Sequence, residues 1–153
     1  MILQLSQNHV IFVPKTKQKH TTMEHKDPIA EAVRYQENAK QIILDNENIE
    51  DGYYEDGKHV KKAGRMMWKG CLIALNFAFQ FKHNSDKDIK DYQNAAAKRS
   101  KKLLNIITSG YQTMHLWLGY DGAKSVSTMK EGRRLADEII EWCRNNAATP
   151  AVA

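Results

Sequence analysis

The segment from residue 58 to residue 82, KHVKKAGRMMWKGCLIALNFAFQFK, constrains the fold more than any other part of the sequence. At 100° per residue, apolar and small side chains occupy most of the circumference of a helix built from it. A helix that is apolar on several sides needs neighbours on several sides, so the pattern predicts the central helix of a bundle. The remaining narrow polar stripe consists of Lys62, Arg65, Lys69, Asn76 and Gln80.

The same segment is not expected to span a membrane. Its most apolar run, residues 70–79, has about half the length that a bilayer requires, and Asn76 interrupts it. Residues 1–13 lack the basic start and the unbroken apolar stretch of a secretory signal. These observations predict a cytoplasmic protein with no membrane partner.

The chain of 153 residues, with a hydrophobic content of 42%, suits one domain with a substantial core. Residues 10–13 have strand propensity, but Pro14 follows and no later segment offers an obvious partner strand. We therefore predict no strand beyond this candidate. The predicted organisation is an extension or weakly ordered arm over residues 1–26, a helical bundle domain over 27–146 and a frayed tail over 147–153.

Capping signals and apolar spacing place the other helices. Asp27 followed by proline marks the start of the first helix, and residues 85–88 resemble a capping box that opens the third. Ser109-Gly110 permits a bend or break before a short fourth helix, and an acidic solvated loop over 45–57 precedes the central helix. The predicted fold is all-α, a four- to five-helix up-and-down bundle. Its helices cover about 27–44, 58–82, 85–107, 111–118 and 125–145.

A polar pair in an otherwise apolar segment is the first candidate for chemistry. Helical spacing places Tyr111 and His115 one turn apart on one face, and Tyr120 and Asp121 follow in a glycine-flanked turn. Such a pair could bind an anion or transfer a proton, since histidine titrates near neutrality. The alternative is a structural histidine that bonds a tyrosine hydroxyl or a loop carbonyl, which is the commoner case for a single histidine in an apolar helix.

Eight cations form the second candidate, a basic surface for anions or nucleic acid. The net charge of +5 permits such a contact without requiring it, because 18 acidic residues are mixed among 23 basic ones. The alternative is a solvated face that the preceding acidic residues partly neutralise. The candidate residues are Lys61, Lys62, Arg65, Lys69, Lys98, Arg99, Lys101 and Lys102.

The sequence gives no indication of a metal or cofactor site. Its six histidines are scattered without metal-ligand spacing, and metalloprotease, Cys-x-x-Cys and phosphate-loop motifs are missing. Cys71 and Cys143 fall on apolar helix faces, which predicts reduced cysteines in the core. We therefore expect no metal and no cofactor.

The order of helices and the Tyr-x-x-Met-His segment at 111–115 resemble the HEPN superfamily of small prokaryotic helical bundles. Within it, the chain looks like an uncharacterised HEPN-like family from Bacteroidetes with no assigned function. The resemblance covers about Asp27 to Asn145 and implies a bacterial, HEPN-like bundle.

Catalytic HEPN proteins resemble metal-independent ribonucleases that carry Arg-x(4–6)-His. In that motif the arginine stabilises phosphate charge and the histidine moves a proton, at a dimer interface that duplicates the pair. No arginine of this chain has a histidine in that range. No residue is therefore assigned as catalytic, and ribonuclease activity is not expected.

Two functional hypotheses follow. The first is a non-catalytic helical-bundle interaction module, expected as a homodimer or with another protein partner. The alternative is a HEPN-like protein that binds nucleic acid or nucleotides through the basic surface, or a component of a toxin–antitoxin or defence system without the usual ribonuclease motif.

Overall fold

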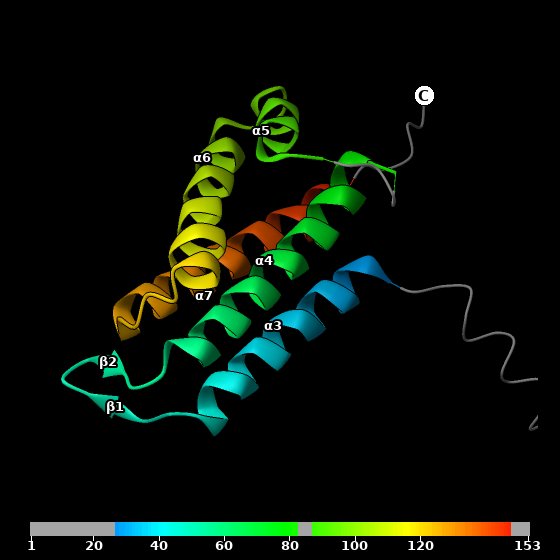
Figure 1. Cartoon of the computed structure of the whole chain (residues 1–153). Helices are drawn as coiled ribbons and strands as arrows, with labels where there is room; N and C mark the ends of the chain where they lie inside the picture. Colours follow the sequence, from blue (N-terminus) through cyan, green and yellow to red (C-terminus); the bar gives the residue numbers. More distant parts are fainter. Residues whose placement is uncertain (1–26, 83–86, 148–153) are drawn as a thin grey trace, which may run out of the picture.

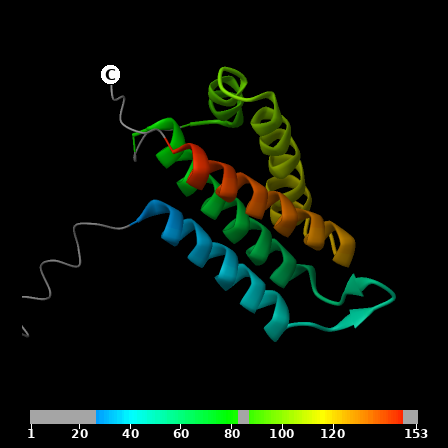
Figure 2. The same ribbon diagram turned by 180° about the vertical axis from the view of Figure 1, so that it is seen from behind.

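The computed structural model describes residues 27–82 and 87–147, which form a bundle of helices (Figure 1). Helices α3 and α4 lie side by side and antiparallel, and α7 lies along the other side of α4 (Figure 2). Helix α6 continues into η1, and together they cross the other helices at a marked angle (Figures 1 and 2). The elements are α3 (Pro28–Asp45), β1 (Ile49–Glu50), β2 (Tyr53–Tyr54), α4 (Gly57–Phe79), α5 (Ile89–Ala97), α6 (Lys101–Gly110), η1 (Tyr111–Tyr120) and α7 (Val126–Asn146).

The predicted all-α class is confirmed, with a two-stranded hairpin as the one sheet in the described residues. None of the helices in residues 27–82 and 87–147 is long and apolar enough to cross a membrane. The predicted arm with its candidate strand lies outside the described residues, as does the predicted tail beyond Ala147.

Helix α4 is the centre of the bundle, as the sequence predicts. It contacts α3 along one side, η1 along another and α7 along a third. Seven of its apolar side chains are almost completely buried, because three neighbouring elements cover them. These residues are Val60, Ala63, Met67, Cys71, Ala74, Leu75 and Ala78.

Side-chain caps fix the predicted helix starts. The Asp27 carboxylate accepts a hydrogen bond from the Ile29 N–H at 3.0 Å, and Pro28 follows in the first turn. The Ser125 hydroxyl likewise accepts from the Thr128 N–H at the start of α7. Both starts agree with the sequence-based prediction.

The third predicted helix is wrong in its continuity. The structure has two helices here, because Ser100 takes an extended conformation and its hydroxyl accepts from the Leu103 N–H as the N-cap of α6. The first of them, α5, begins with a capping box between Asp88 and Asp91. The predicted start at 85–88 lies one turn earlier, and residues 83–86 lie outside the described residues.

The acidic connection contains a hairpin, which corrects the prediction of a plain loop. Strands β1 and β2 pair antiparallel, and Asp51 and Gly52 make the turn with φ values of 52° and 83°. An Asp-Gly pair favours this left-handed two-residue turn. The hairpin is tied to the start of α7, where the Val126 N–H donates to the Gly52 carbonyl at 2.9 Å.

Of the bend or break that the sequence permits at Ser109-Gly110, a break does not occur, because the helix continues from α6 into the π-helix η1. Gly110 serves close packing here. A Cβ atom at this position would lie 3.0 Å from the Ile139 Cδ1 and the Met114 Cε atoms. The wider π-helical turns follow immediately and carry the candidate residues 111–120.

Both cysteines are free and buried, as predicted. The Cys71 thiol lies 4.0 Å from the Met114 sulfur. Burial raises the pKa of the Cys71 thiol well above its ordinary value, and it raises the pKa of Cys143 to about 12. Both side chains therefore act as apolar, unreactive parts of the core.

Candidate functional site

An open groove runs along the amino-terminal half of α4, with a volume of about 600 Å³. Tyr35 of α3 forms one edge, and every other lining residue belongs to α4. We call it the basic groove, because cations dominate its lining and no carboxylate contributes to it. The lining residues are Tyr35, Lys58, His59, Lys61, Lys62, Arg65, Met66 and Lys69.

The charge of the groove follows from the composition of α4, which has five Lys or Arg residues and no Asp or Glu. Three of the five, Lys58, Lys61 and Lys62, lie in the first two turns. Cations at this end of a helix are unfavourable, because the unpaired amide groups there already carry positive potential. The helix and its side chains therefore attract anions in the same place.

Contacts with neighbouring elements position several of these cations. The Arg65 Nε–H donates to the Gly119 carbonyl of η1 at 3.0 Å, and the Lys69 ammonium lies 5.5 Å from the centre of the Tyr35 ring. His59 is 3.7 Å from the Asp56 carboxylate. Within the described residues, the exposed Lys58 and Lys62 side chains form no hydrogen bond or ion pair.

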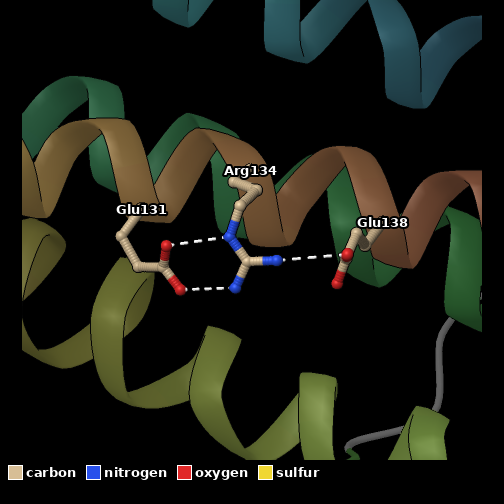
Figure 3. A network of polar contacts seen from close by, with 3 residues as sticks. All are labelled: Glu131, Arg134 and Glu138. Carbon is tan, nitrogen blue, oxygen red and sulfur yellow. Dashed lines mark hydrogen bonds and ion pairs between the residues drawn. The ribbon is translucent and has the colours of Figure 1, made fainter.

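Two arginines of α7, Arg134 and Arg144, form ion pairs with carboxylates, whereas in the described residues the Lys and Arg side chains that line the basic groove form none. On α7 the Arg134 guanidinium forms ion pairs with Glu131 and Glu138, at 2.6 and 3.1 Å (Figure 3). The hydrogen bond from Arg134 lowers the pKa of the Glu131 carboxyl. Neutralisation of this kind is missing from the lining of the basic groove.

The other four candidate cations, Lys98, Arg99, Lys101 and Lys102, lie at the junction of α5 and α6. Arg99 has structural contacts. Its guanidinium donates to the Ala78 and Asn146 carbonyls at 3.0 and 2.9 Å, and it lies 5.0 Å from the Trp142 ring. None of the four lines the basic groove. The structure therefore divides the eight predicted cations into two separate groups.

The structure brings Tyr111 and His115 together as a stack of rings. Their centroids lie 5.0 Å apart with an interplanar angle of 25°, and the edge of Trp68 packs against Tyr111 at 5.8 Å. Both side chains are half-buried. In residues 27–82 and 87–147, neither the Tyr111 hydroxyl nor the His115 imidazole forms a hydrogen bond or ion pair.

Tyr120 and Asp121 do not complete this pair. Tyr120 is 72% exposed, and Asp121 is exposed at the carboxyl end of η1. Among the described residues, neither forms a hydrogen bond, ion pair or ring contact with Tyr111 or His115. The four residues thus do not assemble an acid–base constellation of the kind that proton transfer requires.

Metal-binding geometry is likewise not found in the described part of the chain. No group of three or more His, Cys, Asp or Glu side chains there is placed to hold an ion. The basic groove is consequently the strongest candidate site in these residues.

Sequence reasoning missed part of this groove. Lys58 belongs to the same helical stripe as Lys62 and Lys69, and its spacing could have revealed it. Tyr35 could not have been found in this way, because only the packing of α3 against α4 brings its ring beside Lys69.

Comparison with known proteins agrees with the bounds of this bundle. Residues 27–145 match the family described as a domain of unknown function, DUF5618. The chain belongs to the DUF5618 family. A solved structure of a protein of unknown function from Dyadobacter fermentans is also similar, with 38% sequence identity and a TM-score of 0.72. That match covers 79% of this chain and 96% of the other. A comparison with curated proteins finds no match.

Proposed function

We propose that this DUF5618 protein is a non-catalytic interaction module that binds an anionic partner through the basic groove. The observation that carries the proposal is a groove with five cations and no carboxylate in its lining. A HEPN-like relationship, a bacterial origin and a cytoplasmic location belong to the proposal as well.

Phosphate and carboxylate groups are the chemistry that fits such a surface. Arg and Lys side chains bind both by charge-assisted hydrogen bonds, and an open groove admits an extended ligand. Lys58 and Lys62 are available for this role, because no carboxylate in the described residues neutralises them. The groove is on the rigid central helix, so binding needs no rearrangement of the fold.

Nucleic acid is a second candidate partner, favoured by the place of Tyr35. Its ring borders the cations and lies next to the Lys69 ammonium. Proteins that bind single strands combine a basic groove with aromatic rings on which bases stack. One ring is a smaller platform than such proteins usually present, so we rank this candidate second.

Binding of fluorescent probes tests the proposal. We would titrate the full chain with a single-stranded RNA and with a poly-glutamate peptide, at about 50 mM salt. The groove variant Lys58→Glu/Lys62→Glu is expected to weaken binding at least about tenfold. For RNA it should also reduce the salt dependence by about 0.7 per lost phosphate contact. The matched control is Lys101→Glu/Lys102→Glu, which changes the net charge equally and should bind like the parent.

The outcomes separate the two partners and can overturn the proposal. Poly-glutamate binding alone would favour an acidic protein, and RNA binding alone would favour nucleic acid. Equal losses in the groove and control variants would show that net charge, rather than the groove, attracts the probe. Turnover of RNA, nucleotides or phosphoesters that His115→Ala abolishes would overturn the non-catalytic assignment.

A further inference from the structure

A second groove lies beside the carboxy-terminal half of α4, between this helix and the start of α3, with a volume of about 520 Å³. We call it the apolar groove. Its floor is formed by Leu72, Ile73, Phe77 and Phe81, and Phe77 is 40% exposed. An exposed aromatic ring in a row of apolar side chains indicates a surface that another molecule covers.

The apolar groove has one charge of each sign. Glu31 comes from the first turn of α3, and Lys69 comes from α4. In the described residues neither the Glu31 carboxylate nor the Lys69 ammonium forms an ion pair, and the ammonium lies over the Tyr35 ring. Both charges are therefore available to another molecule.

We propose that the apolar groove is a twofold-symmetric interface with a second copy of this chain. In such an interface the same surface meets itself, so residue i contacts residue j and residue j contacts residue i. A surface with one carboxylate and one ammonium satisfies this condition, because Glu31 of each copy faces Lys69 of the other. Phe77 and its apolar neighbours pack at the centre, where a stable interface needs them.

The basic groove cannot serve as this interface, which limits the contact to one half of α4. Two copies of a surface with five cations and no carboxylate would repel each other. The two halves of the uncovered face thus have different partners. The apolar half binds a second copy, and Lys69, which lines both grooves, belongs to that contact. Lys58, Lys61, Lys62 and Arg65 are left for the anionic partner of the proposed function.

Sedimentation equilibrium of the full chain at micromolar concentrations tests this inference. The parent is expected to be a dimer. Phe77→Glu, Glu31→Lys and Lys69→Glu should each raise the dissociation constant at least about tenfold, since each places a charge in the apolar centre or sets like charges opposite each other. Circular-dichroism melts close to that of the parent would show that the variants remain folded.

Charge exchange gives the decisive measurement. The double variant Glu31→Lys/Lys69→Glu should dimerise again, because its two facing charges are again opposite. An equimolar mixture of the single variants Glu31→Lys and Lys69→Glu should form a heterodimer, since each presents the charges that the other needs. Neither result is expected unless these two residues face each other across a twofold axis.

Two results would overturn the inference. One is a parent chain that stays monomeric. The other is a dimeric parent whose state none of the substitutions changes. The variant Lys58→Glu/Lys62→Glu should lose anion binding and remain a dimer, so the proposed function and this inference can fail separately.

Discussion

Helix α4 presents two faces that differ in almost every physical property. On the covered face, Ala63, Met67, Cys71 and Ala74 have at most 1% of their surface exposed. The uncovered face has unpaired cations in its first half and exposed apolar side chains such as Phe77 in its second. Folding requires the first face. It does not require the second, since cations near a helix start and exposed aromatics both lower stability or solubility. Both proposed binding surfaces accordingly lie on the uncovered face.

The largest expected effect comes from breaking the covered face. Ala74 is completely buried, so Ala74→Glu would place an unpaired carboxylate in the core. We expect a loss of at least about 3 kcal/mol, a large part of the stability of a domain of this size. A circular-dichroism melt measures it. The control is Lys62→Glu, which introduces the same side chain on the uncovered face and should melt at the same temperature as the parent. If Ala74→Glu also melted at that temperature, the difference between the covered and uncovered faces would be contradicted.

A smaller effect is expected where α4 and η1 come closest. A Cβ atom at Gly64 would lie 2.7 Å from both the Gly119 nitrogen and the Leu118 Cβ, so Gly64→Ala must push the two helices apart. We expect a net destabilisation of about 1–3 kcal/mol in urea unfolding, although alanine favours a helix by about 1 kcal/mol. Lys62→Ala is the control without such a contact. A Gly64→Ala variant more stable than the parent would mean that this contact is loose.

The smallest effect concerns the seam between α3 and α7, which flank the covered face. Partial burial is the main cause that raises the pKa of the Asp137 carboxyl above its ordinary value of 3.8. Arg133 opposes this rise, and Glu37 of α3 adds to it. A raised pKa means that the native state holds this proton more tightly than the unfolded state. Protonated Asp137 therefore stabilises the native state at acid pH. This contribution begins to fall as the pH rises above about 3.8, the ordinary pKa, and is lost once the pH exceeds the raised pKa of the native state.

Asp137→Asn should remove this part of the pH dependence. Because the carboxylate is solvent-accessible, we expect a gain of only a few tenths of a kcal/mol in the free energy of unfolding near pH 7. Urea unfolding at pH 4 and pH 7 measures it. Glu55→Gln, which removes an exposed carboxylate on the hairpin side of α4, should leave the difference between the two pH values unchanged. If the free energy of unfolding changed equally between pH 4 and pH 7 in the parent and in Asp137→Asn, Asp137 would not be the source of this pH dependence.

Several features of this protein could be predicted from sequence because their causes are local. The all-α class, the central place of α4 and the buried cysteines follow from apolar spacing. The caps at Asp27 and Ser125 depend on side chains that bond amides two or three residues away. The hairpin turn at Asp51-Gly52 also has a local cause, because an Asp-Gly pair favours positive φ values, so this turn too is predictable from sequence.

The candidate site depended on the tertiary structure, because its properties arise between segments far apart in the chain. Eight cations looked alike in the sequence, yet Arg99 is bonded to the carbonyls of Ala78 and Asn146 while Lys62 stays unpaired in a groove. The Tyr111–His115 pair was correctly placed, but its chemistry depended on neighbours that sequence spacing cannot supply. The sequence alone determined that the central segment forms a helix and which of its side chains are apolar. Only the packing of α3, η1 and α7 against α4 decided which side of that helix stays exposed, because these contacts join segments far apart in the sequence.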